Sequence, residues 1–105
     1  MSKERKSTGT RSRKKESLVT LAAVLDAPQG VELHAALGPL LSDPAPVVLN
    51  AGKVERADTL ALQVLLAFVV ARRSAGHAVE WSETSAEFRR ATDLLGLSQS
   101  LGLVS

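Results

Sequence analysis

The stretch from Val47 to Val70 constrains the fold of this chain more than any other part of its 105 residues. It starts as a short apolar run, continues as a polar loop that ends in Asp58 and Thr59, and then places apolar residues at helical spacing. This order predicts a strand, a loop and a helix from about Thr59 to Ser74. A carboxylate and a hydroxyl at a helix N-terminus form either a helix cap or a signalling site, because the first N–H groups of a helix lack intrahelical partners.

The rest of the chain alternates between short apolar runs and helical periodicity. The apolar runs predict strands at 18–25, 47–49 and 78–81. Apolar residues at spacings of three and four predict helices at 31–41, 59–74 and 85–95, with a short final turn or helix at 97–104. The alternation predicts an α/β sandwich, with helices packed on a small mixed sheet of about four strands.

The periodicity also predicts which side chains face the core. The expected inward residues are Val31, Ala35, Leu37 or Gly38, and Leu41 on the first helix, Leu62, Leu65, Leu66, Val69 and Val70 on the second, and Phe88, Ala91, Leu94 and Leu95 on the third. The unbroken apolar run at 47–49 predicts a strand covered on both faces. Trp81 is expected to pack in the core or at its rim, and Arg72 and Arg73 to complement the negative end of the second helix.

Charge is divided unevenly along the chain. Residues 1–17 carry seven basic and two acidic side chains, whereas residues 18–105 carry six basic and nine acidic ones. A basic segment with almost no apolar residues cannot bury enough surface to offset its ordering entropy, so we expect a disordered tail at 1–17 and one domain at 18–105. The tail is either a solubilising segment or an arm for nucleic acid or anionic lipid. No aromatic or periodic pattern supports the second reading, and we expect no specific nucleic-acid partner.

Several kinds of chemistry have no basis in the sequence. Without cysteine the chain has no disulfide, thiolate metal site or cysteine nucleophile, and its two histidines are too few for a zinc site. No phosphate-binding glycine loop, nucleophile elbow or metalloprotease motif is present, and the paired carboxylates are expected to be solvated. We therefore expect no catalytic residue, cofactor or metal. No apolar run reaches about 18 residues, which predicts a cytoplasmic protein without a membrane span.

The chain resembles the STAS domains, the family of bacterial anti-sigma-factor antagonists and their relatives, in two stretches, VVLNAGKVERADTLALQVLLAFVVARRSAGHAVEW and SAEFRRATDLLGLSQSLGL. The resemblance spans residues 18–104. Four features stand in the order that the family has, namely the strand at 47–50, the pair Asp58-Thr59, the stretch 62–66 and the late Leu94-Gly96-Leu97 segment. It implies a STAS-like sandwich and a non-catalytic module that binds a protein partner through the loop before the second helix and the exposed side of that helix.

The chain also departs from the family pattern. Phosphorylated antagonists resemble Asp-Ser-Ser-Gly with the phosphoacceptor third, whereas here Leu60 and Ala61 follow Asp58-Thr59. The remaining hydroxyl, on Thr59, resembles the Asp-Thr pair with which the STAS subunit of the lipid-asymmetry ABC transporter meets its ATPase. The phrase VERADTLALQVLLAF, with Trp81 behind it, is also similar to small STAS proteins encoded among bacterial chemotaxis components.

The resemblance leaves two functions open. One is a signal-transduction module of the partner-switching or chemotaxis kind, with a histidine-kinase-like partner. The other is a subunit of a lipid-transport complex, with an ABC ATPase partner. Thr59 is the candidate phosphoacceptor or partner switch, and we expect a monomer or weak dimer. The implied partner-binding residues are Lys53, Glu55, Arg56, Asp58, Thr59, Leu60 and Gln63.

Overall fold

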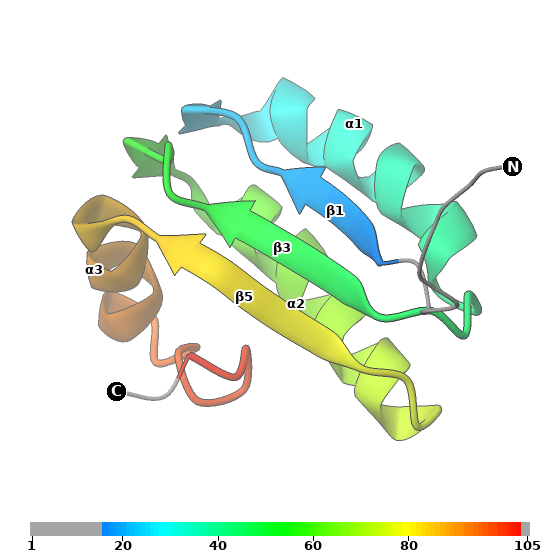
Figure 1. Ribbon diagram of the computed structural model, residues 1–105. Coiled ribbons are helices and arrows are strands. Elements are labelled where there is room, and N and C mark those ends of the chain that lie inside the picture. Colours follow the sequence, from blue (N-terminus) through cyan, green and yellow to red (C-terminus); the bar gives the residue numbers. More distant parts are fainter. Residues whose placement is uncertain (1–15, 104–105) are drawn as a thin grey trace, which may run out of the picture.

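The computed structural model describes residues 16–103 and confirms the α/β class (Figure 1). Its elements are β1 (Ser17–Thr20), β2 (Val24–Leu25), α1 (Ala27–Leu37), the 3₁₀ turn η1 (Gly38–Leu40), β3 (Val47–Ala51), β4 (Arg56–Ala57), α2 (Thr59–Ser74), β5 (Val79–Thr84) and α3 (Ala86–Leu94). The tail expected at 1–17 lies outside the described residues, except for Glu16 and Ser17, the latter of which opens β1.

The strands form two small parallel sheets. The larger has the order β1-β3-β5, and β2 pairs with β4 in a separate two-stranded ladder. The expected sheet of about four strands thus corresponds to five short strands, and every pairing among the described residues is parallel. Helices α1 and α2 cover one face of the larger sheet, and α3 lies beyond the end of β5. Among residues 16–103, no helix covers the other face, which is open in Figure 1.

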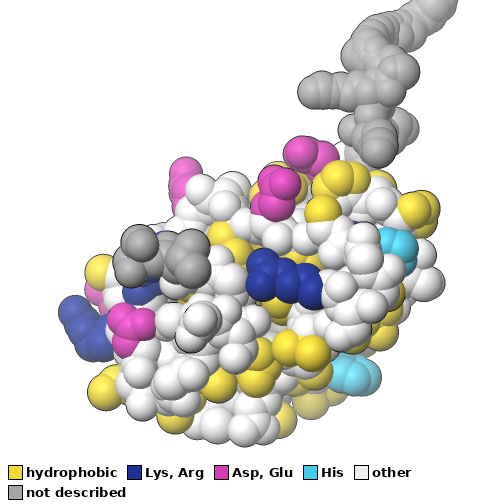
Figure 2. All heavy atoms as spheres, turned by 90° about the horizontal axis from the view of Figure 1, so that it is seen from below, with side chains coloured by type: hydrophobic (Ala, Val, Ile, Leu, Met, Phe, Trp, Pro, Cys, Tyr) yellow, Lys and Arg dark blue, Asp and Glu magenta, His cyan; other side chains and the backbone are white. Residues whose placement is uncertain are grey.

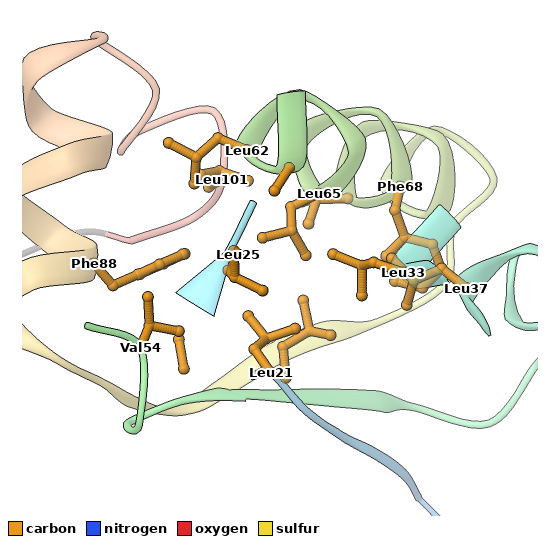
Figure 3. Packing of buried hydrophobic residues seen from close by; sticks show 14 of the residues in the cluster. Leu21, Leu25, Leu33, Leu37, Val54, Leu62, Leu65, Phe68, Phe88 and Leu101 are labelled. Atoms are coloured by element: carbon orange, nitrogen blue, oxygen red, sulfur yellow. The ribbon is translucent and has the colours of Figure 1, made fainter. Parts of the chain in front are cut away.

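The core lies between the larger sheet and the helices, as Figure 3 shows. Along β3, Val47, Leu49 and Ala51 are buried while Val48 and Asn50 are only half-buried. The expectation that this strand is covered on both faces is therefore wrong. The strand is covered on only one face because both crossover helices, α1 and α2, pack on the same face of the sheet. Every second side chain of β3 therefore points to the open face of the sheet.

Helix α1 begins four residues earlier than expected. Asp26 caps it, with Oδ1 accepting from the backbone N–H of Gln29 at 3.2 Å, and Pro28 is tolerated because the first turn needs no N–H donor. The buried residues of α1 are Gly30, Leu33 and Leu37. The expected inward positions of Val31, Ala35 and Leu41 are wrong, because all three are exposed.

The other two helices confirm the inward expectation only in part. In α2, Leu62, Leu65 and Val69 are buried and Leu66 packs at the edge of the core, but Val70 is exposed. In α3, Phe88 is buried and Ala91 half-buried, whereas Leu94 and Leu95 are exposed. The expected inward positions of Leu94 and Leu95 are therefore wrong, and the segment after α3 contributes Leu101 and Leu103 to the core.

Trp81 packs at the rim of this core. Its ring lies 5.3 Å from the ring of Phe88, centroid to centroid, and its indole N–H donates to the carbonyl of Leu101 at 2.8 Å. The aromatic pair and the hydrogen bond together fix the C-terminal segment against β5 and α3, because a half-buried indole N–H needs an acceptor.

Arg72 does not lie at the helix surface, so its expected role at the end of α2 is wrong. It is fully buried, and its guanidinium donates to the carbonyls of Leu40, Asp43, Ala45 and Ala78 at 2.5 to 2.9 Å. These carbonyls belong to the segments that lead into β3 and β5. Arg72 thus links the two segments that enter the sheet, and their carbonyls supply the acceptors that its buried guanidinium requires.

Candidate functional site

The short β2–β4 ladder brings the N-termini of α1 and α2 together. Leu25 is the register partner of Ala57, and the backbone N–H of Asp58 donates to the carbonyl of Leu25 at 2.9 Å. The residue that follows each strand, Asp26 or Asp58, is the N-cap of the next helix. The ladder therefore places two capping carboxylates side by side at one edge of the molecule.

Asp58 caps α2 directly. Its Oδ1 accepts from the backbone N–H of Ala61 at 3.4 Å, which is long for such a bond. Thr59 is the first helical residue and its side chain is exposed. Asp58 can therefore cap the helix while the hydroxyl of the next residue, Thr59, remains accessible to a partner or a kinase.

The loop before α2 is held on both sides. The backbone N–H of Glu55 donates to the carbonyl of Ala23 at 2.7 Å, and the carbonyl of Val54 accepts from the hydroxyl of Ser85 at 2.5 Å. Val54 itself is buried. A loop anchored to the core and to the start of α3 presents its outward side chains in one arrangement, which lowers the ordering entropy that a binding partner must overcome.

All of the partner-binding residues expected from the sequence are exposed, and all belong to this loop or to the first two turns of α2. They are Lys53, Glu55, Arg56, Asp58, Thr59, Leu60 and Gln63. We call them the loop–α2 surface. It mixes both signs of charge with one large apolar side chain, Leu60, which is 47% exposed. Charged groups around an apolar contact contribute to the choice of a protein partner and to the rate of its association.

Next to the loop–α2 surface lies a feature that the sequence reasoning missed. A groove of about 230 Å³ runs between the two helices, and we call it the α1–α2 groove; it is lined by Gly30, Val31, His34, Leu60 and Val64. The two helices approach each other closely at Gly30, where an added Cβ would lie 3.4 Å from the Cα of Ala61. A glycine inside a helix costs about 1 kcal/mol against alanine, and that was the available signal of a close approach.

A second hollow lies on α3 and offers no chemistry of its own. It measures about 510 Å³ and is lined by Ala86, Arg89, Arg90, Asp93 and Leu94. Neither hollow joins a nucleophile to a general base. Among residues 16–103, no three His, Asp or Glu side chains lie close enough together to hold a metal ion.

The surface charges do not gather into a single field on the face that Figure 2 shows. Basic and acidic side chains are interspersed there, and some of opposite sign lie next to one another. A nucleic-acid interface usually shows a basic stripe or patch, and this face has none. Within the described part of the chain, no helix is both long and apolar enough to cross a bilayer.

Comparison with protein families gives a match to the family described as Mlab, STAS domain, over residues 8–105. A comparison with curated proteins gives no match. The family match spans all of the described elements, including the loop–α2 surface and the α1–α2 groove.

Proposed function

Because the chain belongs to the STAS domain family, whose members serve in general as regulatory and binding modules, we propose that it docks on a kinase or ATPase partner in bacterial signalling, of the partner-switching or chemotaxis kind. Docking occurs through the loop–α2 surface and involves no catalysis by this chain. The observation that carries the proposal is the exposed hydroxyl of Thr59 beside the capping carboxylate of Asp58, at the end of an anchored loop.

Phosphorylation of Thr59 would make this surface a switch. A phosphate adds a charge of about −1.5 to −2 at neutral pH. The start of α2 favours that charge through the helix dipole, whereas the Asp58 and Asp26 carboxylates beside it oppose it. A partner that docks against Asp58 would lose its contact, or would need an arginine to hold the phosphate.

The second candidate is a subunit of a lipid-transport ABC complex that binds and stabilises its ATPase. It is supported by the position of the hydroxyl, directly after the aspartate at Thr59 and not at position 60, which is leucine. In this function the surface is a constitutive contact and Thr59 is not modified. Both candidates place the chain in the cytoplasm, as a monomer or weak dimer, with a protein and not a nucleic acid as its partner.

The proposal is tested by affinity capture from the native host with three proteins in parallel. They are the wild type, Thr59→Glu and the matched control Ser100→Glu, which adds the same charge at an exposed site in the C-terminal turn. We expect a kinase-like or ABC ATPase partner with the wild type and the control but not with Thr59→Glu, because the longer side chain prevents the partner from packing closely against the start of α2. Equal capture by all three proteins would contradict the proposal.

The identity and stoichiometry of the captured protein choose between the two candidates. A kinase that is released when Thr59 is phosphorylated supports the signalling module. An ABC ATPase that co-purifies in a fixed ratio, with Thr59 unmodified, supports the transporter subunit.

A further inference from the structure

We propose that the α1–α2 groove is the seat for an amphipathic helix of the partner protein, which inserts an apolar side chain into the groove and turns a basic side chain toward Asp26 and Asp58. The inference rests on the proposed function and adds the chemistry of the partner to it. It also adds residues of α1 to a docking surface that the sequence places only on the loop and α2.

The groove has the size and the lining for one large apolar side chain. An apolar cavity of about 150 Å³ accommodates benzene, so a groove of about 230 Å³ admits a side chain of the size of leucine or phenylalanine. The apolar walls come from both helices. Val31 is 66% exposed and Leu60 is 47% exposed, and covering them would remove apolar surface from water.

The walls of the groove are helical ridges. Val31 and His34 are three residues apart on α1, and Leu60 and Val64 are four apart on α2, so that each pair lies along one face of its helix. The two helices begin side by side at the β2–β4 ladder, so these ridges flank the groove from its N-terminal end. A third helix can therefore pack one row of its side chains into the groove between these two ridges.

The two ends of the groove differ in charge, which determines how a partner helix would be oriented in it. At its N-terminal end lie Asp26 and Asp58, each of which uses Oδ1 for its cap hydrogen bond. The lining itself contains neither lysine nor arginine, and its one titratable residue is His34, two turns along α1 from Asp26. An apolar anchor accompanied by a lysine or arginine within one helical turn matches this order of apolar and acidic groups.

A second copy of this chain is the strongest competing occupant. Its α3 carries Arg90 and Leu94 four residues apart, and Leu94 is 80% exposed. However, the same nine-residue helix also carries Glu87 and Asp93, whose charges would approach the two capping carboxylates. A separate partner without these carboxylates fits the acidic end better.

The test uses a displayed library of helical peptides, randomised on one face and selected on the wild-type chain. The enriched peptides are then measured by calorimetry against Val31→Glu, Leu60→Glu and the matched control Val70→Glu, which is exposed on α2 outside the groove. We expect peptides with a large apolar residue and a lysine or arginine within one turn. Binding should weaken by about tenfold or more with the two groove variants and by less than about twofold with the control.

Asp58→Asn tests the acidic end separately. Asparagine caps a helix about as well as aspartate, so the fold is retained while one charge is removed. We expect the selected peptides to bind this variant about threefold to tenfold more weakly and with less dependence on salt. Thermal unfolding of each variant by circular dichroism verifies that it is folded.

Three results would overturn the inference. The first is a selection without enriched peptides, or with peptides that show no basic preference. The second is peptide binding that is insensitive to Val31→Glu but lost with Gln63→Arg. That result would reject the groove as the binding site and leave the proposed function standing, whereas insensitivity to both variants would count against the proposed function as well. The third is self-association in sedimentation that is abolished by either Val31→Glu or Leu94→Glu, which would make a second copy the occupant.

Discussion

The guanidinium of Arg72 donates a hydrogen bond of 2.7 Å to the carbonyl oxygen of Ala78, the residue just before β5. The same side chain also reaches three carbonyls between α1 and β3, so one residue of α2 holds both segments that enter the sheet. Within the described part of the chain, its Nε is a buried polar atom without a hydrogen-bond partner. The dense contacts of the other guanidinium nitrogens offset the cost of burying this charge.

We expect Arg72→Met to lower the free energy of unfolding by about 3–5 kcal/mol, because it removes all four hydrogen bonds that tie the segments before β3 and β5 to α2. Arg72→Lys should recover only part of that loss, since an ammonium cannot reach the acceptors that a planar guanidinium spans. Urea unfolding followed by circular dichroism measures both changes. The control Arg90→Met, on an exposed arginine of α3, should change the value by less than about 0.5 kcal/mol. A loss below about 1 kcal/mol for Arg72→Met would contradict this role.

Two glycines should respond differently to alanine. Gly38 has a φ of −52° at the end of α1, and no atom outside its chain neighbours would crowd a methyl group there. Pro39 follows it, however, and proline disfavours the helical conformation for a preceding residue that carries a Cβ, which offsets the entropic gain, so Gly38→Ala should change the stability by less than about 0.5 kcal/mol. Gly76 has a φ of 81°, which L side chains rarely adopt, so Gly76→Ala should destabilise the chain by about 1 kcal/mol although nothing crowds the site. Thermal unfolding of the two variants checks the prediction, and a loss of stability for Gly38→Ala as large as that for Gly76→Ala would contradict it.

The capping role of Asp58 predicts a difference between its alanine and asparagine variants. Asp58→Ala should lower the stability by about 0.5–1 kcal/mol, the lower part of the usual range, because the cap hydrogen bond is long. Asp58→Asn should leave the stability nearly unchanged, since asparagine caps equally well. Chemical unfolding measures both. If Asp58→Ala is as stable as the wild type, Asp58 is not an effective cap.

Sequence reasoning located α2 well because its signals are local. Asp58 marks its start and Gly76 its end, and the structure has the helix at Thr59–Ser74 as expected. It misplaced the start of α1 because the cap at Asp26 was not taken as the start. It also took Val31 and Ala35 as the inward stripe, whereas Gly30, Leu33 and Leu37, which have similar helical spacing, are the buried residues. In α3 the sequence could not show that Leu94 and Leu95 would be exposed, while Leu101 and Leu103, from beyond the helix, would lie in the core.

The site was predictable only where it is continuous in the chain. The exposed loop–α2 surface follows from local patterns and from the family resemblance, and the roles of its residues stay predictions. The burial of Arg72 was not predictable, because most of its acceptors are backbone carbonyls 27 to 32 residues away. The α1–α2 groove depends on the pairing of Leu25 with Ala57, which no periodicity within either helix reveals.

The central claim is that a protein partner docks at the edge where α1 and α2 begin. Hydrogen–deuterium exchange of the chain, alone and in complex with the ATPase or kinase captured from its host, tests this claim most directly. We predict that the partner slows exchange in residues 51–66 and in the first two turns of α1, and leaves β5 and α3 unchanged. Slowed exchange confined to α3 or to the open face of the sheet would contradict the claim.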